Sequence, residues 1–124
     1  MDERVNKDKQ EIIEPILAHL WQTIAARKTA SAGDSYTAQL IANGVAATGR
    51  KLNEEAVEML MAALALEKQR TDETEEQFVK EAADLLYHFL VLLAVCDSDL
   101  TRVLDELKQR TARSGLAEKA ARKK

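Results

Sequence analysis

Residues that interrupt helices are scarce in this chain of 124 residues, which contains one proline and four glycines. Residues that favour strands are also few, and aromatic side chains make up only 4% of the sequence. Alanine, leucine, glutamate and lysine dominate instead, and all four favour helices. A chain of this length forms one domain with a real core. We therefore predict a single all-α domain over residues 1–124, a bundle of four to five helices with a basic tail from about residue 114.

Cysteine is nearly absent, and the single Cys96 excludes an intramolecular disulfide. It ends an apolar run, so we expect its thiol to be buried. The polar, charged start of the sequence differs from a signal peptide, and the apolar run at 85–95 is too short to span a bilayer. The expectation is a soluble cytoplasmic protein without a membrane partner.

Charge is unevenly distributed, although the net charge is only −3. Residues 108–124 hold seven basic side chains and one acidic side chain, which leaves the preceding chain near −9. Such an end suits a solvated tail, a nucleic-acid contact or a clamp for a polyanionic small molecule. The scarcity of aromatic side chains argues against a stacking platform for single-stranded nucleic acid, and we expect no nucleic-acid partner.

Five carboxylates stand out because they lie where apolar helical faces begin. They are Glu54, Glu55, Glu58, Glu81 and Asp84. At about 100° per residue, the first three fall within an arc of roughly 100° that Met61, Ala62 and Ala65 continue. The last two share a stripe with His88, and the residues at 85–95 are almost all apolar. We expect that second helix to be buried nearly all round.

Ionised carboxylates near a protein interior are costly unless they are paired. A divalent cation is the most plausible partner, and ligands that are all oxygen suit hard ions. Mg2+ keeps several waters and commonly bridges carboxylates to substrate phosphates, so we predict a Mg2+ site that acts on a phosphate substrate. The alternative is that the first three acids are solvated residues of a first turn, where the helix dipole favours them.

The hydrophobic pattern predicts helices at 6–27, 36–43, 53–68, 75–95 and 99–112. Pro15 either bends the first helix or marks its start, and Gly44 is a plausible left-handed cap. The segment 45–50 is ambiguous. Asn53 is predicted to be an N-cap, which places the paired glutamates in a first turn, and a charged connector is expected at 69–74.

The two long helices should form an antiparallel hairpin, because their connector is short. At about 1.5 Å per residue, Lys68 at the end of the first helix lies roughly 20 Å from Glu54. A simple hairpin then separates the two carboxylate sets, unless the second helix begins well before Glu81 or the connector climbs back. If the sets meet, the first helix must run shorter, with residues 65–76 folded back, or they meet across a subunit interface. The large apolar fraction predicts a homodimer in any case.

Four segments together resemble one known family. They read SYTA at 35–38, KLNEEAVE at 51–58, EAADLLYH at 81–88 and SGLAEK at 114–119. The carboxylate spacing is similar to the metal motif of the all-α, MazG-like nucleoside triphosphate pyrophosphohydrolases. With the flanking segments, residues 17–122 resemble the phosphoribosyl-ATP pyrophosphatase family.

The resemblance implies Mg2+-dependent hydrolysis of phosphoribosyl-ATP to phosphoribosyl-AMP and pyrophosphate, the second step of histidine biosynthesis. The five carboxylates carry over as metal ligands or as the base for the attacking water, with the base unassigned. Two departures stand out. Asn53 replaces the glycine usual in the family, and we expect this to be harmless because asparagine tolerates the same conformations. The segment 64–76 is longer and more charged than expected, which we interpret as a longer exposed connector.

Ten further residues are candidates for substrate binding by position or by resemblance. They are Arg27, Lys28, Ser35, Tyr36, Thr37, Lys51, His88, Ser114, Lys119 and Arg122. Most have a structural alternative: solvation for the first three basic residues, helix packing for the tyrosine, a satisfied core position for the histidine, and a disordered end for the last three.

Two other functions compete with this interpretation. A house-cleaning pyrophosphohydrolase would act on free nucleoside triphosphates with the same metal site and another pocket, but the segments at 35–38 and 114–119 argue against it. A non-enzymatic bundle that binds a metal or a partner is the second. A di-iron carboxylate bundle would carry Glu-x-x-His twice, and this sequence carries none. The expected partner is a small-molecule nucleotide.

Overall fold

The computed structural model describes residues 3–30, 33, 35–112, 119 and 122, with side chains described from residue 13 onward. Its helices are α1 (Glu3–Arg27), α2 (Tyr36–Ala42), α3 (Gly44–Lys68), α4 (Asp72–Val95) and α5 (Leu100–Ala112). No strand occurs within this described part of the chain. The predicted all-α fold is confirmed.

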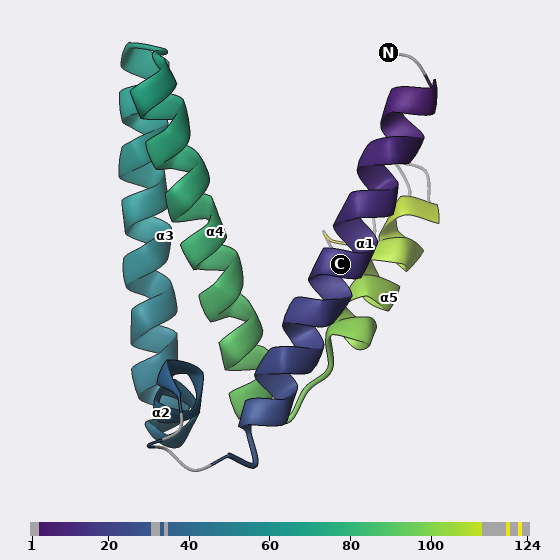
Figure 1. Cartoon of the computed structure of the whole chain (residues 1–124), viewed down its shortest axis with the longest axis vertical. Coiled ribbons are helices and arrows are strands. Elements are labelled where there is room, and N and C mark those ends of the chain that lie inside the picture. Colours follow the sequence, from purple (N-terminus) through teal and green to yellow (C-terminus); the bar gives the residue numbers. More distant parts are fainter. Residues whose placement is uncertain (1–2, 31–32, 34, 113–118, 120–121, 123–124) are drawn as a thin grey trace.

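The helices form two arms that diverge from a common base (Figure 1). One arm is the antiparallel hairpin of α3 and α4, and the other is α1 with α5 beside it. The short α2 lies at the base and contacts both helices of the hairpin. The two arms meet where the last part of α4 packs against the last part of α1.

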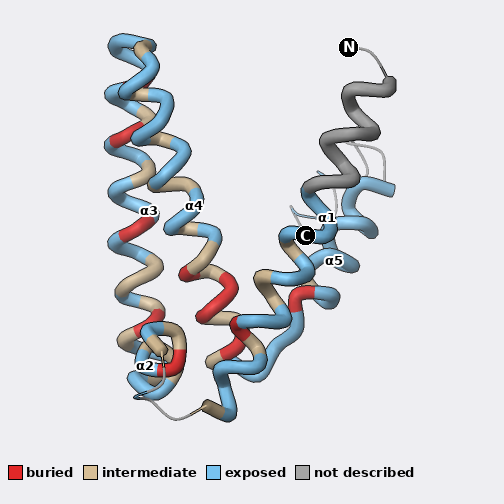
Figure 2. Tube along the Cα trace, in the orientation of Figure 1, coloured by how far each residue is buried: buried red, intermediate tan, exposed pale blue. Residues whose placement is uncertain are grey.

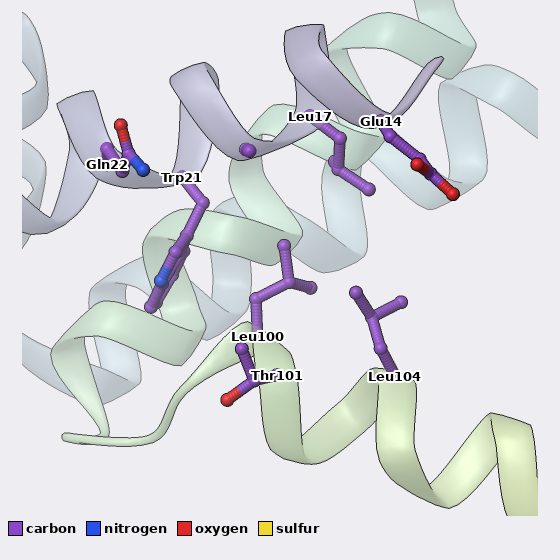
Figure 3. Close-up of a pocket in the computed structure, with 8 residues that line it drawn as sticks. Glu14, Leu17, Trp21, Gln22, Leu100, Thr101 and Leu104 are labelled. Atoms are coloured by element: carbon purple, nitrogen blue, oxygen red, sulfur yellow. The ribbon is translucent and has the colours of Figure 1, made fainter. Parts of the chain in front are cut away.

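The hydrophobic core sits at this base, as Figure 2 shows. It consists of Ile24, Leu90, Val91, Ala94 and Leu100, contributed by α1, α4 and α5. Leu90 and Val91 are completely buried. Farther up the second arm, a mainly apolar cavity of about 350 Å3 separates α1 from α5 (Figure 3). The core therefore fixes the lower end of α4, from which the hairpin rises.

The junction between α2 and α3 is a sharp elbow with its own hydrogen bonds. Ser35 caps α2, since its Oγ accepts from the Ala38 N–H at 3.0 Å. Gly44 has φ +88°, which confirms the predicted left-handed conformation at this glycine. The buried Thr48 hydroxyl lies 2.7 Å from the Gly44 carbonyl oxygen and 3.2 Å from that of Leu40. Thr48 therefore ties the start of α3 to the end of α2.

The prediction that α3 begins at Asn53 was wrong. The helix starts at Gly44, directly after α2, and the ambiguous segment 45–50 is helical. Gly49 does not interrupt it, because a single glycine costs only about 1 kcal/mol within a helix. Asn53 is thus an interior helical residue, and the paired glutamates lie roughly three turns into α3, away from the dipole of its first turn.

The charged connector is also shorter than predicted, because α4 begins at Asp72. Thr71 is its N-cap and forms a capping box with Thr74: the Thr74 N–H donates to Thr71 Oγ1 at 3.1 Å, and the Thr71 N–H donates to Thr74 Oγ1 at 2.9 Å. The acidic residues after the cap favour the start of a helix. The residues at 64–76 that looked long for the family therefore extend the two helices and leave only 69–71 as connector.

Three smaller expectations also meet the structure. α1 continues as a helix through Pro15. The expected all-round burial of the apolar segment of α4 was wrong, since Leu86 is 46% exposed in the single chain. Cys96 is exposed rather than buried, because it is the C-cap of α4 where the helix turns towards α5. None of the described helices has the length and apolar character that crossing a membrane would require.

Candidate metal centre

The hairpin brings the two carboxylate sets together within one chain. Glu55 lies 13 residues before the end of α3, and Asp84 lies 12 residues after the start of α4. In an antiparallel pair these two offsets cancel. Single oxygen atoms of Glu55, Glu81 and Asp84 lie within 4.8 Å of one another. The sequence left open that the sets meet if the second helix begins well before Glu81, and this alternative is confirmed, since α4 begins at Asp72. The other two alternatives, a shorter first helix and a subunit interface, are not needed, because α3 still ends at Lys68.

Glu58 and Glu54 flank this group of three on α3. The charge of Glu55 is the main cause that raises the pKa of Glu58, and partial burial and the nearby Glu81 add to it. Glu58 is exposed, so its carboxylate is accessible from solvent. The Glu54 side chain is 64% exposed and lies 3.6 Å from the Lys51 ammonium. The acids thus form a graded site, buried at Glu55 and open at Glu54 and Glu58.

The inner carboxylates have oxygens that lack hydrogen-bond donors. Glu55 is 5% exposed, and its Oε2 is buried without a partner among the described residues. The Oε2 atom of Glu81 is also buried without a partner among the described residues, while the Glu81 Oε1 atom accepts a hydrogen bond from Gln77 Nε2 at 2.6 Å. Buried polar atoms are nearly always paired, so two unpaired carboxylate oxygens from residues of one cluster suit a hard cation. A solvated acidic face describes Glu54 but not Glu55.

His88 lies one turn beyond Asp84 on the same stripe of α4, and it is 5% exposed. Its Nδ1 is 2.7 Å from the backbone carbonyl oxygen of Asp84. Because a carbonyl can only accept, Nδ1 carries the proton and Nε2 is left as an acceptor. That Nε2 is buried without a partner in the described part of the chain. One of the two ring nitrogens is therefore satisfied, and the other is not.

Four of the substrate candidates lie by the lower half of the hairpin, on α2 or on the first part of α3. Thr37 on α2 hydrogen-bonds the hydroxyl of Tyr87, the residue before His88. Lys51 on α3 reaches Glu55 Oε1 at 3.3 Å. Ser35 caps α2, and the Tyr36 side chain beside it is 56% exposed. The SYTA segment and the carboxylates are thus linked through α4.

The other candidates lie elsewhere. Lys28 forms an ion pair with Asp97, which follows the end of α4 and is roughly 20 Å along the helix from Asp84. Arg27 is exposed at the end of α1. Ser114 lies outside the described residues, and Lys119 and Arg122 are exposed. Within the described residues, neither Arg27 nor Lys28 forms an ion pair with one of the five carboxylates.

Two contributors to the site escaped prediction from sequence. Gln77 donates to Glu81 from one turn earlier on α4, and its spacing of four residues was the available signal. Tyr87 anchors Thr37, and its place inside the segment 81–88 was the available signal.

The sequence of this chain matches that of a known protein family. The phosphoribosyl-ATP pyrophosphohydrolase family matches residues 17–111. A phosphoribosyl-ATP pyrophosphatase of Parvibaculum lavamentivorans is 51% identical over 106 residues, which cover 86% of this chain and 91% of that protein. Proteins of the same name from Agrobacterium fabrum and Methylobacterium nodulans are 45% and 48% identical, over 86% and 87% of this chain and 92% and 94% of theirs. The chain belongs to the phosphoribosyl-ATP pyrophosphohydrolase family.

Proposed function

We propose that this chain hydrolyses phosphoribosyl-ATP to phosphoribosyl-AMP and pyrophosphate, with Mg2+ held by Glu55, Glu81 and Asp84. The observation that carries the proposal is the convergence of these three carboxylates, two of which have a buried oxygen without a donor among the described residues. The family and the names of the relatives supply the substrate and the place of the reaction in histidine biosynthesis. A nucleotide substrate of this kind agrees with a cytoplasmic, single-domain enzyme.

The donor set suits Mg2+ because it consists of carboxylate oxygens alone. When bound, the ion supplies positive charge that neutralises the charge developing on the phosphoryl oxygens. We assign the proton acceptor for the attacking water to Glu58, which is exposed and whose pKa is raised chiefly by Glu55. Glu54, four residues before it, completes the set at the open rim.

Support for substrate binding differs among the candidates. Lys51 contacts Glu55, His88 contacts Asp84, and Thr37 contacts Tyr87 beside His88. We therefore propose that these three candidates contact the phosphoribosyl-ATP phosphates or ribose. Ser35 is the N-cap of α2 and Tyr36 is the first residue of this helix, which also carries Thr37. We propose that both lie next to the substrate. Arg27, Lys28 and the tail residues Ser114, Lys119 and Arg122 stay predictions from the sequence.

We also propose that the enzyme works as a homodimer through the back of α3. Val57, Leu60, Met61 and Leu64 recur at helical spacing and are 49–64% exposed. At about 100° per residue they lie on the side of α3 opposite the buried residues that face α4. A contiguous exposed apolar stripe is typical of a protein interface. Since the predicted homodimer needs such a surface, a second copy of the chain is the proposed occupant.

The proposed activity is tested by supplying the pure protein and Mg2+ with phosphoribosyl-ATP, ATP or dUTP and measuring pyrophosphate. We expect phosphoribosyl-ATP to be cleaved far faster than either free triphosphate. Comparable rates on the free triphosphates would assign the chain to the house-cleaning class. If none of the three nucleotides is cleaved, the result would contradict an enzymatic role for the carboxylates.

A further inference from the structure

Lys51 occupies a singular position beside the carboxylates. Its Nζ lies 3.3 Å from Glu55 Oε1 and 3.6 Å from Glu54 Oε2. Within the described part of the chain, no other lysine or arginine forms an ion pair with Glu55. The pairing follows from the sequence, because residues four apart on a helix lie on the same face. Lys51 is therefore the cation that the folded chain itself supplies to the buried end of the site.

Glu54 and Glu55, which both pair with Lys51, differ in how strongly they are buried. The Glu55 side chain is 6% exposed and that of Glu54 is 64% exposed, so only Glu55 depends on a protein cation to offset lost hydration. A lysine ammonium is charged near neutral pH, so it can offset the Glu55 carboxylate at this distance. The Lys51 side chain is 36% exposed, so its charged end is free to turn towards solvent.

We infer that Lys51 is an exchangeable counter-ion: it neutralises Glu55 in the metal-free protein, is displaced when a divalent cation binds Glu55, and then binds a phosphate of the substrate. This inference rests on the proposed function. A divalent cation on Glu55 would repel an ammonium at its present distance from that carboxylate. The displaced ammonium lies at the mouth of a site that receives a polyphosphate, which is the anion it can bind next.

Exchange has consequences that a fixed ion pair lacks. A counter-ion that competes with the metal stabilises the metal-free fold and weakens metal binding. Removing Lys51 should therefore lower the stability of the metal-free fold and raise the affinity for the metal. Substituting a lysine that is only solvated at the surface would change neither the stability nor the metal affinity. Substituting a lysine that only binds the substrate would change KM alone.

The test compares Lys51→Met, Lys51→Arg and the control Lys80→Met. Lys80 is matched because it also pairs with a glutamate four residues away, Glu76 at 3.2 Å, yet both side chains of this pair are well exposed. Three quantities are measured: the melting temperature without metal, the Kd for Mg2+ by calorimetry without substrate, and KM and kcat for phosphoribosyl-ATP.

For Lys51→Met we expect a lower metal-free melting temperature, Mg2+ binding tighter by about tenfold, and a raised KM with a smaller change in kcat. Lys51→Arg keeps the charge and should bind Mg2+ like the parent. Lys80→Met should change the Kd by less than about twofold. An unchanged or weaker Mg2+ affinity in Lys51→Met would overturn the exchange, even if KM rises.

Failure of the proposed function looks different. A parent protein that binds Mg2+ but does not cleave phosphoribosyl-ATP would contradict the proposed substrate, and the Mg2+ comparison would still support or overturn the displacement of Lys51. A parent protein that binds no Mg2+ would overturn the exchange together with the metal site.

Discussion

At the scale of single residues, Glu55 is the most deeply buried of the five carboxylates at the site. It is buried at 5% exposure, one of its oxygens lacks a donor in the described chain, and Glu58 and Glu81 bring further negative charge close to it. Such local conflicts are typical of functional sites, where stability is given up for binding. Neutralising one of these acids should therefore relieve the fold while it damages the site.

The substitution Glu58→Gln tests this trade-off. It removes the negative charge that repels the Glu55 carboxylate but keeps the shape of the side chain. We therefore expect an equal or higher metal-free melting temperature, weaker Mg2+ binding and loss of pyrophosphate release. Glu106→Gln on α5 is the control, since Glu106 is exposed and pairs only with Arg110 in the described chain. A Glu58→Gln protein that keeps full activity and the parent's Mg2+-induced rise in melting temperature would remove Glu58 from the site.

The raised pKa of Glu58 also predicts a pH dependence with a definite sign. Because the folded-state pKa lies above the unfolded value, Glu58 favours the metal-free fold when it is protonated, and this contribution is lost as pH rises through the folded pKa. Protonation of Glu58 removes a negative charge beside the ligands Glu55 and Glu81, so the Kd for Mg2+ should rise as pH falls from about 7 to about 5. Calorimetry at several pH values checks this. An identical slope in Glu58→Gln would show that another group titrates.

At the scale of elements, the sequence predicted that the helices exist and erred at their ends. The apolar periodicity of α1, α3, α4 and α5 is a local signal, and so is the left-handed Gly44. The start of α3 was misplaced because Asn53 has the chemistry of a cap, whereas the actual start depends on the Thr48 hydroxyl reaching the end of α2. The meeting of the carboxylates depends on the register of the whole hairpin. The end of α3 was predicted at its actual residue, but the start of α4 was placed three residues too late.

The elbow between α2 and α3 gives a prediction at this scale. Thr48→Val keeps the side-chain shape but leaves the Leu40 carbonyl without its hydroxyl partner inside the protein, so we expect a loss of about 1 to 2 kcal/mol in the free energy of unfolding. Thr23→Val on α1 removes a similar but exposed bond to His19 and should cost less than about 0.5 kcal/mol. Urea unfolding of both variants measures the difference. Equal losses would contradict the role given to Thr48.

At the scale of the molecule, the described fold leaves much of its apolar surface uncovered. The core lies at the base of the two arms, whereas the hairpin rises from it with only α3 and α4 packed against each other (Figure 2). Leu60 is 58% exposed and Met61 is 64% exposed on the stripe that we propose as the dimer interface. Composition alone predicted the need for a partner copy, but the face of α3 that it should cover became visible only with the hairpin built.

A charge on that stripe should separate the copies. We expect Leu60→Glu to lower the molar mass in solution from that of a dimer to that of a monomer, because a carboxylate would be buried without a partner in the interface. Leu107→Glu on α5 is the control, as Leu107 is also exposed but lies on the other arm. Light scattering after size-exclusion chromatography measures both. A parent that is already monomeric, or a Leu60→Glu protein that stays dimeric, would contradict the proposed interface.

The central claim is that Glu55, with Glu81 and Asp84, holds the divalent cation on which hydrolysis depends. Its most direct test is the rate of pyrophosphate release from phosphoribosyl-ATP as Mg2+ is increased, in the parent and in Glu55→Gln. We predict a saturable Mg2+ dependence in the parent, loss of the rate with EDTA, and no release by Glu55→Gln although its helical circular dichroism signal is retained. A parent rate that is undiminished by EDTA, or a Glu55→Gln rate equal to that of the parent, would contradict the account.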